Sequence, residues 1–270
     1  MRIRSLLAVS LSSALLLGAS AAASAQDDPA QLLAQSLTAT SAATSFHFLV
    51  TADGAINLGD SFGGKPLDIT GAKAEGDVSV SPQAVQISEF AVPLGPVSIS
   101  GGLIYPNDGN VYIKLALPGA SAADLWHSIA TGNMVPNLTA SPVPGDPDMA
   151  TKISDAITQS GATLTNEGDV PCVAGTCTKL HLEVPASALD STVGAMLPGG
   201  SPAPSAAAAA PIPVDILVDN ATKFVDSVSA HVVEASSGLD LTIAIQLSAF
   251  NQPVTITAPP ADQVTTAPLF

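Results

Sequence analysis

The chain has 270 residues, of which 47% are hydrophobic, 11% charged and only 4% aromatic, and its formal net charge is −15 at pH 7. After the N-terminal region its cations are six lysines, against 23 acidic residues. This balance argues strongly against nucleic acid as a partner, because Lys and Arg supply most of the affinity for phosphate. We interpret the acidity as a property that keeps the protein in solution.

The N-terminus has the pattern of a signal peptide. Two arginines are followed by an apolar stretch over residues 6–17, and a small-x-small triplet that a signal peptidase can cut ends at Ala25. The apolar stretch is too short for a confident membrane-spanning helix. We therefore expect residues 1–25 to be cleaved off before Gln26, leaving a soluble exported chain that is secreted or located in the cell envelope.

The mature chain is predicted to begin with a helix and to continue with strands. Residues 29–43 carry apolar side chains at helical spacing and a proline suited to the first turn. The spacing changes to alternation at 46–51, which predicts a strand, and the Gly- and Asp-rich residues 53–70 are predicted to be a loop. Further alternation predicts strands within 78–87, 97–103 and 111–117, with a hairpin turn at Asn107–Asn110.

Helices and loops are predicted for the middle of the chain. Residues 121–132 and 148–160 have helical spacing, and Gly161 is expected to end the second helix. The proline-containing residues 133–147 between them are predicted to be a loop. A strand follows at 178–184, and a short helix is predicted near 186–196.

The C-terminal third is predicted to consist mainly of strands. Residues 198–213 form an Ala- and Pro-rich low-complexity segment, which we interpret as a solvated loop because it cannot bury enough apolar surface to become ordered. Alternation then predicts strands at 214–218, 228–233, 239–249 and 254–257.

These elements predict an α+β protein with about nine strands in antiparallel order. Clean alternation gives each strand one apolar side and one wet side. The expected architecture is a strongly curved antiparallel sheet, a half-barrel, with helices covering its concave apolar face. Such a sheet encloses either an apolar pocket or a core filled by side chains, and periodicity does not decide between the two.

Two cysteines, Cys172 and Cys177, flank a short segment that contains Gly175. An even number of cysteines in an exported chain favours a structural disulfide. A redox pair and a metal site are the alternatives. A redox pair usually has two intervening residues where this one has four, and His181 is the only further ligand nearby, which is too few for zinc.

No catalytic, cofactor or metal motif is evident, so the sequence does not predict an enzyme. Three histidines, at 47, 181 and 231, fall out of phase with the apolar residues of strands, and His127 lies on a predicted helix; all four are interpreted as surface residues. The acid pairs Asp27/Asp28, Asp146/Asp148 and Asp215/Asp219 are interpreted as solvated. A hydrolase with a triad near His47, His181 or His231 stays a weaker hypothesis, because triads assemble in space.

The remaining candidate site is apolar. Seven residues represent the apolar sides of the predicted strands, and they would line either a ligand cavity or an ordinary core: Val50, Val78, Ile99, Ile113, Leu182, Val232 and Ile243.

The order of segments resembles the LppX/LprAFG family of mycobacterial cell-envelope lipoproteins, within the LolA-like group of lipid carriers. The likeness covers most of residues 30–265 and includes the early helix. It lies in four short pieces, Ser45–Phe48, Ala72–Val78, Gly109–Lys114 and Phe250–Pro260.

This resemblance implies a single half-barrel domain over residues 26–270, with a hydrophobic cavity that carries acyl chains of lipids across the envelope. It implies no catalytic residue and no cofactor. The implied partners are a lipid or another apolar small molecule, and an envelope membrane or transport protein of unknown identity. The family's lipobox cysteine is absent from Leu17–Ser20, which favours a soluble carrier, and the loop at 198–213 departs from the family pattern. The alternative function is a structural or interaction protein of the envelope with a filled core.

Overall fold

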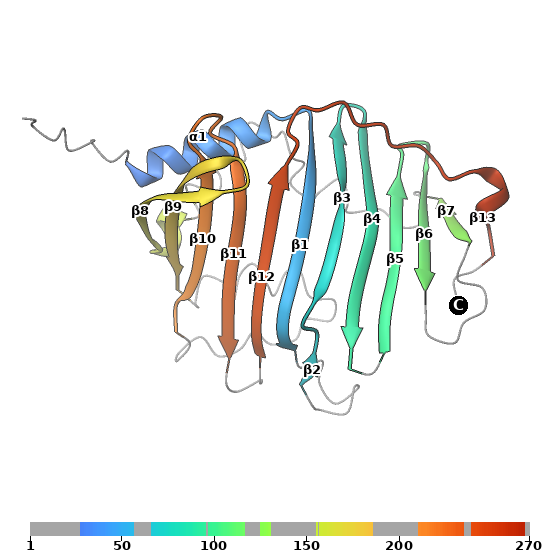
Figure 1. Ribbon diagram of the computed structural model, residues 1–270, viewed down its shortest axis with the longest axis horizontal. Coiled ribbons are helices and arrows are strands. Elements are labelled where there is room, and N and C mark those ends of the chain that lie inside the picture. The colour runs from blue at the N-terminus through green and yellow to red at the C-terminus, as the bar shows by residue number, and fades with distance from the viewer. Residues whose placement is uncertain are drawn as a thin grey trace, which may run out of the picture.

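A large curved sheet dominates the computed structural model, which describes residues 28–56, 66–95, 97–116, 125–130, 155, 157–185, 210–234 and 239–267. Thirteen strands form this sheet, and it does not close into a barrel (Figure 1). The strands are β1 (Ser45–Ile56), β2 (Leu67–Asp68), β3 (Ala72–Val80), β4 (Gln83–Leu94), β5 (Val97–Tyr105), β6 (Asn110–Ala116), β7 (Trp126–Ala130), β8 (Thr163–Cys172), β9 (Gly175–Val184), β10 (Ile212–Asp219), β11 (Val225–Glu234), β12 (Leu239–Ser248) and β13 (Val264–Thr265).

Strand β1 lies in the middle of the sheet, between β3 and β12. On one side the order continues β3, β4, β5, β6, β7, β13, and on the other β12, β11, β10, β9, β8. All pairings are antiparallel except that of β13 with β7, and β2 adds a short pairing to β1. The predicted curved antiparallel sheet is therefore confirmed, with more strands than the sequence indicated.

Helix α1 (Pro29–Ser41) confirms the predicted first helix. Pro29 occupies its first turn, and the side chain of Asp28 accepts a hydrogen bond from the N–H of Ala30 at 3.0 Å, which caps the N-terminus. Its buried Leu32 and Leu33 pack into a cluster with residues of β9, β10 and β11, namely Leu180, Ile216, Val218 and Val225.

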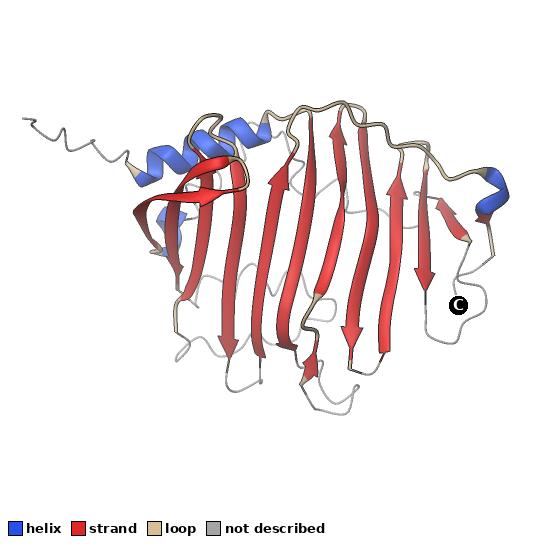
Figure 2. Cartoon of the chain, viewed as in Figure 1, coloured by secondary structure: helices blue, strands red, loops and turns tan. Residues whose placement is uncertain are grey.

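Helix therefore covers one end of the sheet in the described part of the chain, where α1 contacts β8 and β11 (Figure 2). Residues 155 and 157–160 are also helical, Ile157 packs against the same cluster, and Gly161 follows with φ of 71°. This agrees with the predicted end of the 148–160 helix. The prediction that helices cover the concave apolar face is not confirmed, because in the described part of the chain α1 packs only against this end of the sheet.

The predicted helix at 121–132 is wrong, because residues 126–130 form strand β7. β7 pairs with β6, and the ring of Trp126 lies so close to Gly102 of β5 that a Cβ on that glycine would come within 3.0 Å of it. Strand pairing and packing of this ring have overridden a local helical pattern. The helical placement predicted for His127 is wrong with it, although its side chain is still partly accessible at the edge of the sheet.

The predicted strand at 254–257 is also absent, and these residues are extended but unpaired. Three prolines, at 253, 259 and 260, lack the N–H that a strand ladder needs. The segment instead runs across the ends of β1, β3, β4, β5 and β6 to the 3₁₀ helix η3 (Ala261–Gln263) and β13 (Figure 1).

Two predicted boundaries shift. Strand β1 continues to Ile56 and β2 occupies Leu67–Asp68, so parts of the segment predicted as a loop from residue 53 are strand. Strand β10 begins at Ile212, inside the segment predicted as low-complexity loop. The predicted signal peptide, the loop at 133–147, the helix at 186–196 and most of 198–213 lie outside the described residues. Within the described part of the chain, no helix is both long and apolar enough to cross a membrane.

Candidate functional site

The register of the sheet shows on which of its two faces each predicted apolar residue lies. Side chains of directly paired residues point to the same side, and successive residues of a strand point to opposite sides. Val50 of β1 pairs with Ile245 of β12, so Ile243 lies on the same face two residues away. Val232 of β11 pairs with Leu241, again two residues from Ile243. We call this side of the sheet the apolar face.

The apolar face continues across the strands that follow β1 in the sequence. Val78 of β3 pairs with Phe46, which is four residues before Val50. The register through β4 carries the same face to Leu103 of β5. Leu103 pairs with Ile113 of β6, and Ile99 lies four residues before Leu103.

Leu182 of β9 belongs to the same face, because the register links it through Val214 and Ala230 to Ile243. All seven predicted residues therefore share one face, but they span the sheet from β9 to β6. With about 4.8 Å between neighbouring strands, this distance is roughly 40 Å along the sheet. A compact ligand cannot contact all seven, whereas an elongated one can.

The middle of the apolar face keeps accessible apolar surface. Leu182 is buried, and the other six predicted residues are half-buried. Ile245, beside Val50 on the central strands, is 37% exposed. Val97, two residues before Ile99 on the same face, is 44% exposed. Burial is completed at the end under α1 and left incomplete at the centre.

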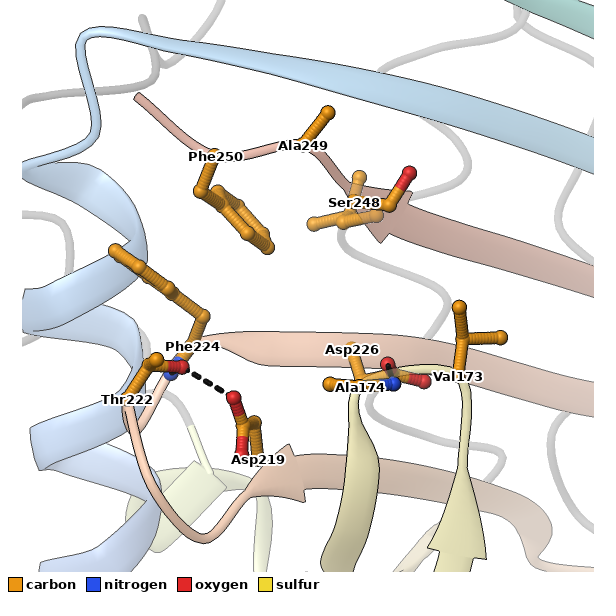
Figure 3. Close-up of a pocket in the computed structure, with 10 residues that line it drawn as sticks. Val173, Ala174, Asp219, Thr222, Phe224, Asp226, Ser248, Ala249 and Phe250 are labelled. Carbon is orange, nitrogen blue, oxygen red and sulfur yellow. Dashed lines mark hydrogen bonds between the residues drawn. The ribbon is translucent and has the colours of Figure 1, made fainter. Parts of the chain in front are cut away.

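A pocket of about 220 Å³ lies at the ends of β10, β11 and β12, beside the turn between β8 and β9. We call it the rim pocket. Leu247, which packs against the cluster under α1, contributes to its lining. Phe224 and Phe250 stack with ring centroids 4.2 Å apart at one end, and the Val173–Ala174 turn lies at the other (Figure 3). The pocket is smaller than the roughly 300–1,000 Å³ of typical ligand sites, so it can hold only one end of a ligand.

Two carboxyl groups lie in the lining of the rim pocket, and both are buried. Asp219 accepts hydrogen bonds from the N–H of Ala221 at 2.9 Å and from the hydroxyl of Thr222 at 2.6 Å. Asp226 accepts one from the N–H of Ala174 at 3.3 Å and is 4% exposed. A bulge between β10 and β11 directs Asp226 toward the β8–β9 turn, since Val225 and Ser227 flank it in the shifted register.

The environment of Asp226 disfavours negative charge. Burial raises its pKa above the usual range, the N–H of Ala174 lowers it, and the charge of Asp219 raises it again, for a net upward shift. The predicted disulfide between Cys172 and Cys177 is confirmed and closes the turn that supplies this N–H.

The face opposite the apolar face carries charged residues, and we call it the polar face. Three histidines on it confirm the predicted out-of-phase positions, and each lies within hydrogen-bonding distance of an aspartate on a neighbouring strand. His47 Nδ1 lies 3.0 Å from Asp77, and His181 Nδ1 lies 2.7 Å from Asp215. The third pair is His231 and Asp240, at 2.9 Å. His127 lies at the edge of the sheet, with Nδ1 3.0 Å from the carbonyl oxygen of Ala267.

A small charge network lies on the polar face of β8, β9 and β10. The ammonium of Lys179 lies 3.0 Å from Glu167 and 3.0 Å from Asp215, and these hydrogen bonds raise the pKa of Lys179. Burial tends to raise the pKa of Asp215, but the hydrogen bonds from His181 and Lys179 outweigh it and hold that pKa below its usual range. The lysine supplies the positive charge between the two carboxylates.

The sequence did not single out the rim pocket. Asp219 was expected to be solvated and is buried, Asp226 and Phe224 carried no recognisable motif, and Phe250 stood only in a segment of the family resemblance and not as a site residue. The Asp-Asn-Ala-Thr turn after β10 was a usable signal, because aspartate side chains often accept hydrogen bonds from the backbone two residues on. The position of Phe250 depends on long-range contact with Phe224 and could not be deduced locally.

Comparisons with known proteins support the fold. No protein-family model matches the chain, and no curated protein matches it in sequence. LprF from Mycobacterium bovis superimposes with a TM-score of 0.52 at 16% identity, covering 86% of this chain and 96% of that one. The lipoprotein LppX of Mycobacterium tuberculosis matches with a TM-score of 0.47 at 21% identity, covering 85% of this chain and 100% of that one. The chain shares the LprF fold, so the predicted resemblance is confirmed for the architecture.

Proposed function

We propose that the chain is an exported, non-enzymatic lipid carrier of the LppX/LprAFG type, which holds acyl chains against the apolar face of its sheet. The observation that carries this proposal is the exposure of Ile245. It lies among apolar neighbours on the central strands, yet 37% of its surface is accessible. A core filled by the protein's own side chains would bury an isoleucine at this place.

The length of the apolar face favours an elongated ligand. Val50, Ile243 and Val232 would contact it at the centre, while Ile99 and Ile113 would contact it toward β6. The rim pocket would receive one end of such a chain. Each buried methylene contributes about 0.8 kcal/mol, so acyl chains supply the affinity without any specific polar contact.

Export is part of the proposal. The disulfide between Cys172 and Cys177 is typical of oxidising compartments, and the N-terminal sequence has the signal-peptide pattern. The shared LprF fold supports membership of the same group of envelope proteins. A membrane or transport protein that delivers or receives the lipid would be the partner.

Binding of an uncharged apolar dye, 1-N-phenylnaphthylamine, tests the proposal, together with mass spectrometry of lipid extracted from the purified protein. We expect bound dye to fluoresce and to be displaced by acyl chains. Ile245→Gln should weaken dye binding about tenfold, because it places an unpaired amide on the apolar face. Val233→Gln is the matched control, since Val233 is 54% exposed on the polar face. Protein that carries no lipid and ignores the dye would instead favour a structural protein with a filled core.

A further inference from the structure

The carboxyl group of Asp226 is buried but only half satisfied. The residue is 4% exposed, and its Oδ1 accepts the 3.3 Å hydrogen bond from the N–H of Ala174. Its other oxygen, Oδ2, has no hydrogen-bond partner in the described part of the chain. No side-chain oxygen there is both fully buried and unpartnered, so Oδ2 keeps some accessible surface. Buried carboxyl groups are normally satisfied, and one that is not requires an explanation.

The accessible space beside Asp226 is the rim pocket, whose lining includes this residue (Figure 3). Most of the remaining lining is apolar, with Leu247 in the wall and the stacked rings of Phe224 and Phe250 at one end. A ligand that fills this volume of about 220 Å³ must therefore combine an apolar body with a group that suits a carboxylate.

No positive charge of the protein neutralises this carboxylate. In the described part of the chain Asp226 forms no ion pair, and the charge that acts on its pKa is that of Asp219, which has the same sign. Folding has already removed most of the water from the Asp226 carboxylate. A cation bound beside it would therefore gain a charge-assisted hydrogen bond without a new desolvation cost on the protein side.

The number of available ligand atoms decides which kind of cation the pocket can hold. Both carboxyl oxygens of Asp219 accept hydrogen bonds within its own turn, so Asp226 offers the one unused oxygen. The sulfur atoms of Cys172 and Cys177 lie nearby but are joined in the disulfide. Ca²⁺ requires about six to eight oxygen ligands, which this pocket does not supply. An ammonium group, in contrast, can donate a single N–H to one oxygen.

We infer that the rim pocket binds a small organic ammonium ion, which donates an N–H to Oδ2 of Asp226 and packs its hydrocarbon part against the phenylalanine rings and Leu247. The inference goes beyond the carrier function and does not require it. A carried lipid would enter this pocket with an end that bears an amine. The buried charge of Asp226 is unfavourable in the free protein, as expected for a group that is kept ready for a charged ligand.

Benzylamine and benzyl alcohol form a matched pair of probes, because they share an apolar body and only the amine is protonated at neutral pH. Each is titrated into the ¹⁵N-labelled protein and followed by nuclear magnetic resonance. We expect benzylamine to bind at least about tenfold more tightly at pH 7 and to shift the resonance of the Ala174 N–H, which bonds to the same carboxyl group. The preference should disappear near pH 3, where the carboxyl group is protonated.

A pair of charge variants localises the effect. Asp226→Asn removes the charge and keeps a hydrogen-bond acceptor, so it should abolish the preference for the amine. Asp240→Asn makes the same change of net charge at an exposed position on the polar face and should keep nearly all of it. Circular dichroism confirms that both variants are folded.

Three results would overturn the inference. The first is equal affinity for the amine and the alcohol at pH 7, and the second is no binding of either probe. The third is a preference that both variants reduce equally, which would show that overall net charge attracts the amine. None of these results affects binding of 1-N-phenylnaphthylamine, so the carrier function stands or fails separately.

Discussion

At Asp226 a carboxyl group is buried beneath a tight turn with one backbone N–H at hydrogen-bonding distance. The bulge in β11 puts it there, and the Cys172–Cys177 disulfide holds the turn above it. Because the pKa of Asp226 is raised in the folded protein, its contribution to stability is fully present below the unfolded value and is lost as pH rises through the folded pKa.

Replacing Asp226 by Asn should therefore stabilise the protein at neutral pH. The amide keeps an oxygen to accept the N–H of Ala174 and removes the buried charge. We expect the Tm to rise by about 2–4 °C at pH 7, equivalent to about 1 kcal/mol, and the difference from wild type to vanish near pH 3. Thermal unfolding followed by circular dichroism measures both. A Tm that falls at pH 7 but not near pH 3 would show that Asp226 is favourable in its charged form, and would contradict this prediction.

Asp215 on the polar face should show the opposite pH dependence. Its pKa is lowered in the folded protein, so its contribution is present above the unfolded value and is lost as pH falls through the folded pKa. We expect Asp215→Asn to reduce stability by about 1 kcal/mol or less at pH 7, because the pair is partly exposed, and the loss to disappear below about pH 3. Asp240→Asn, at the more exposed pair with His231, is the control and should have a smaller effect. Equal losses would contradict the role of Lys179.

The individual strands show how much of the secondary structure could be predicted from the sequence. Alternation in residues 46–51 and 239–249 predicted the first half of β1 and all of β12 because each has one apolar side. β7 was missed because its five residues depend on pairing with β6 and on the contact between Trp126 and Gly102. The segment 254–257 gave the opposite error, since its alternation suggested a strand, but the prolines that flank it, Pro253 and Pro259, cannot donate to a strand ladder.

The C-terminal segment protects the edge of the sheet. β13 pairs with β7 through Val264 and Trp126, and the carbonyl oxygen of Ala267 lies 3.0 Å from His127 Nδ1, which places it to accept a hydrogen bond from the ring. Deleting residues 261–270 should expose the edge of β7 and promote association between chains. We expect the fluorescence of Trp126, the single tryptophan, to shift to longer wavelength and light scattering to increase. Unchanged emission and scattering would show that this pairing does not protect the edge.

At the scale of the whole molecule, the sequence predicted which residues form the candidate site. It did not predict how exposed they are or where a pocket forms. Val50 and Ile243 were predicted on apolar strand sides, and the register places them on one face. Their exposure and the rim pocket depend on which part of that face α1 covers, and no local pattern specifies this.

Ligand binding should stabilise the whole sheet, because the apolar face exists only in the folded protein. At a free dioctanoylglycerol concentration of about 100 times Kd, we expect the free energy of unfolding to rise by about 2.7 kcal/mol. Urea denaturation with and without the lipid measures this rise, and Ile245→Gln should reduce it at the same lipid concentration. An unchanged midpoint despite displacement of the dye would place binding outside the folded sheet.

The central place of β1 has a consequence for the order of assembly. This strand is synthesised early, yet one of its two neighbours is β12, which lies almost 200 residues later in the chain. The two halves of the sheet cannot join until nearly the entire polypeptide is available. A chain with this connectivity stays open during synthesis, which suits the export that we propose.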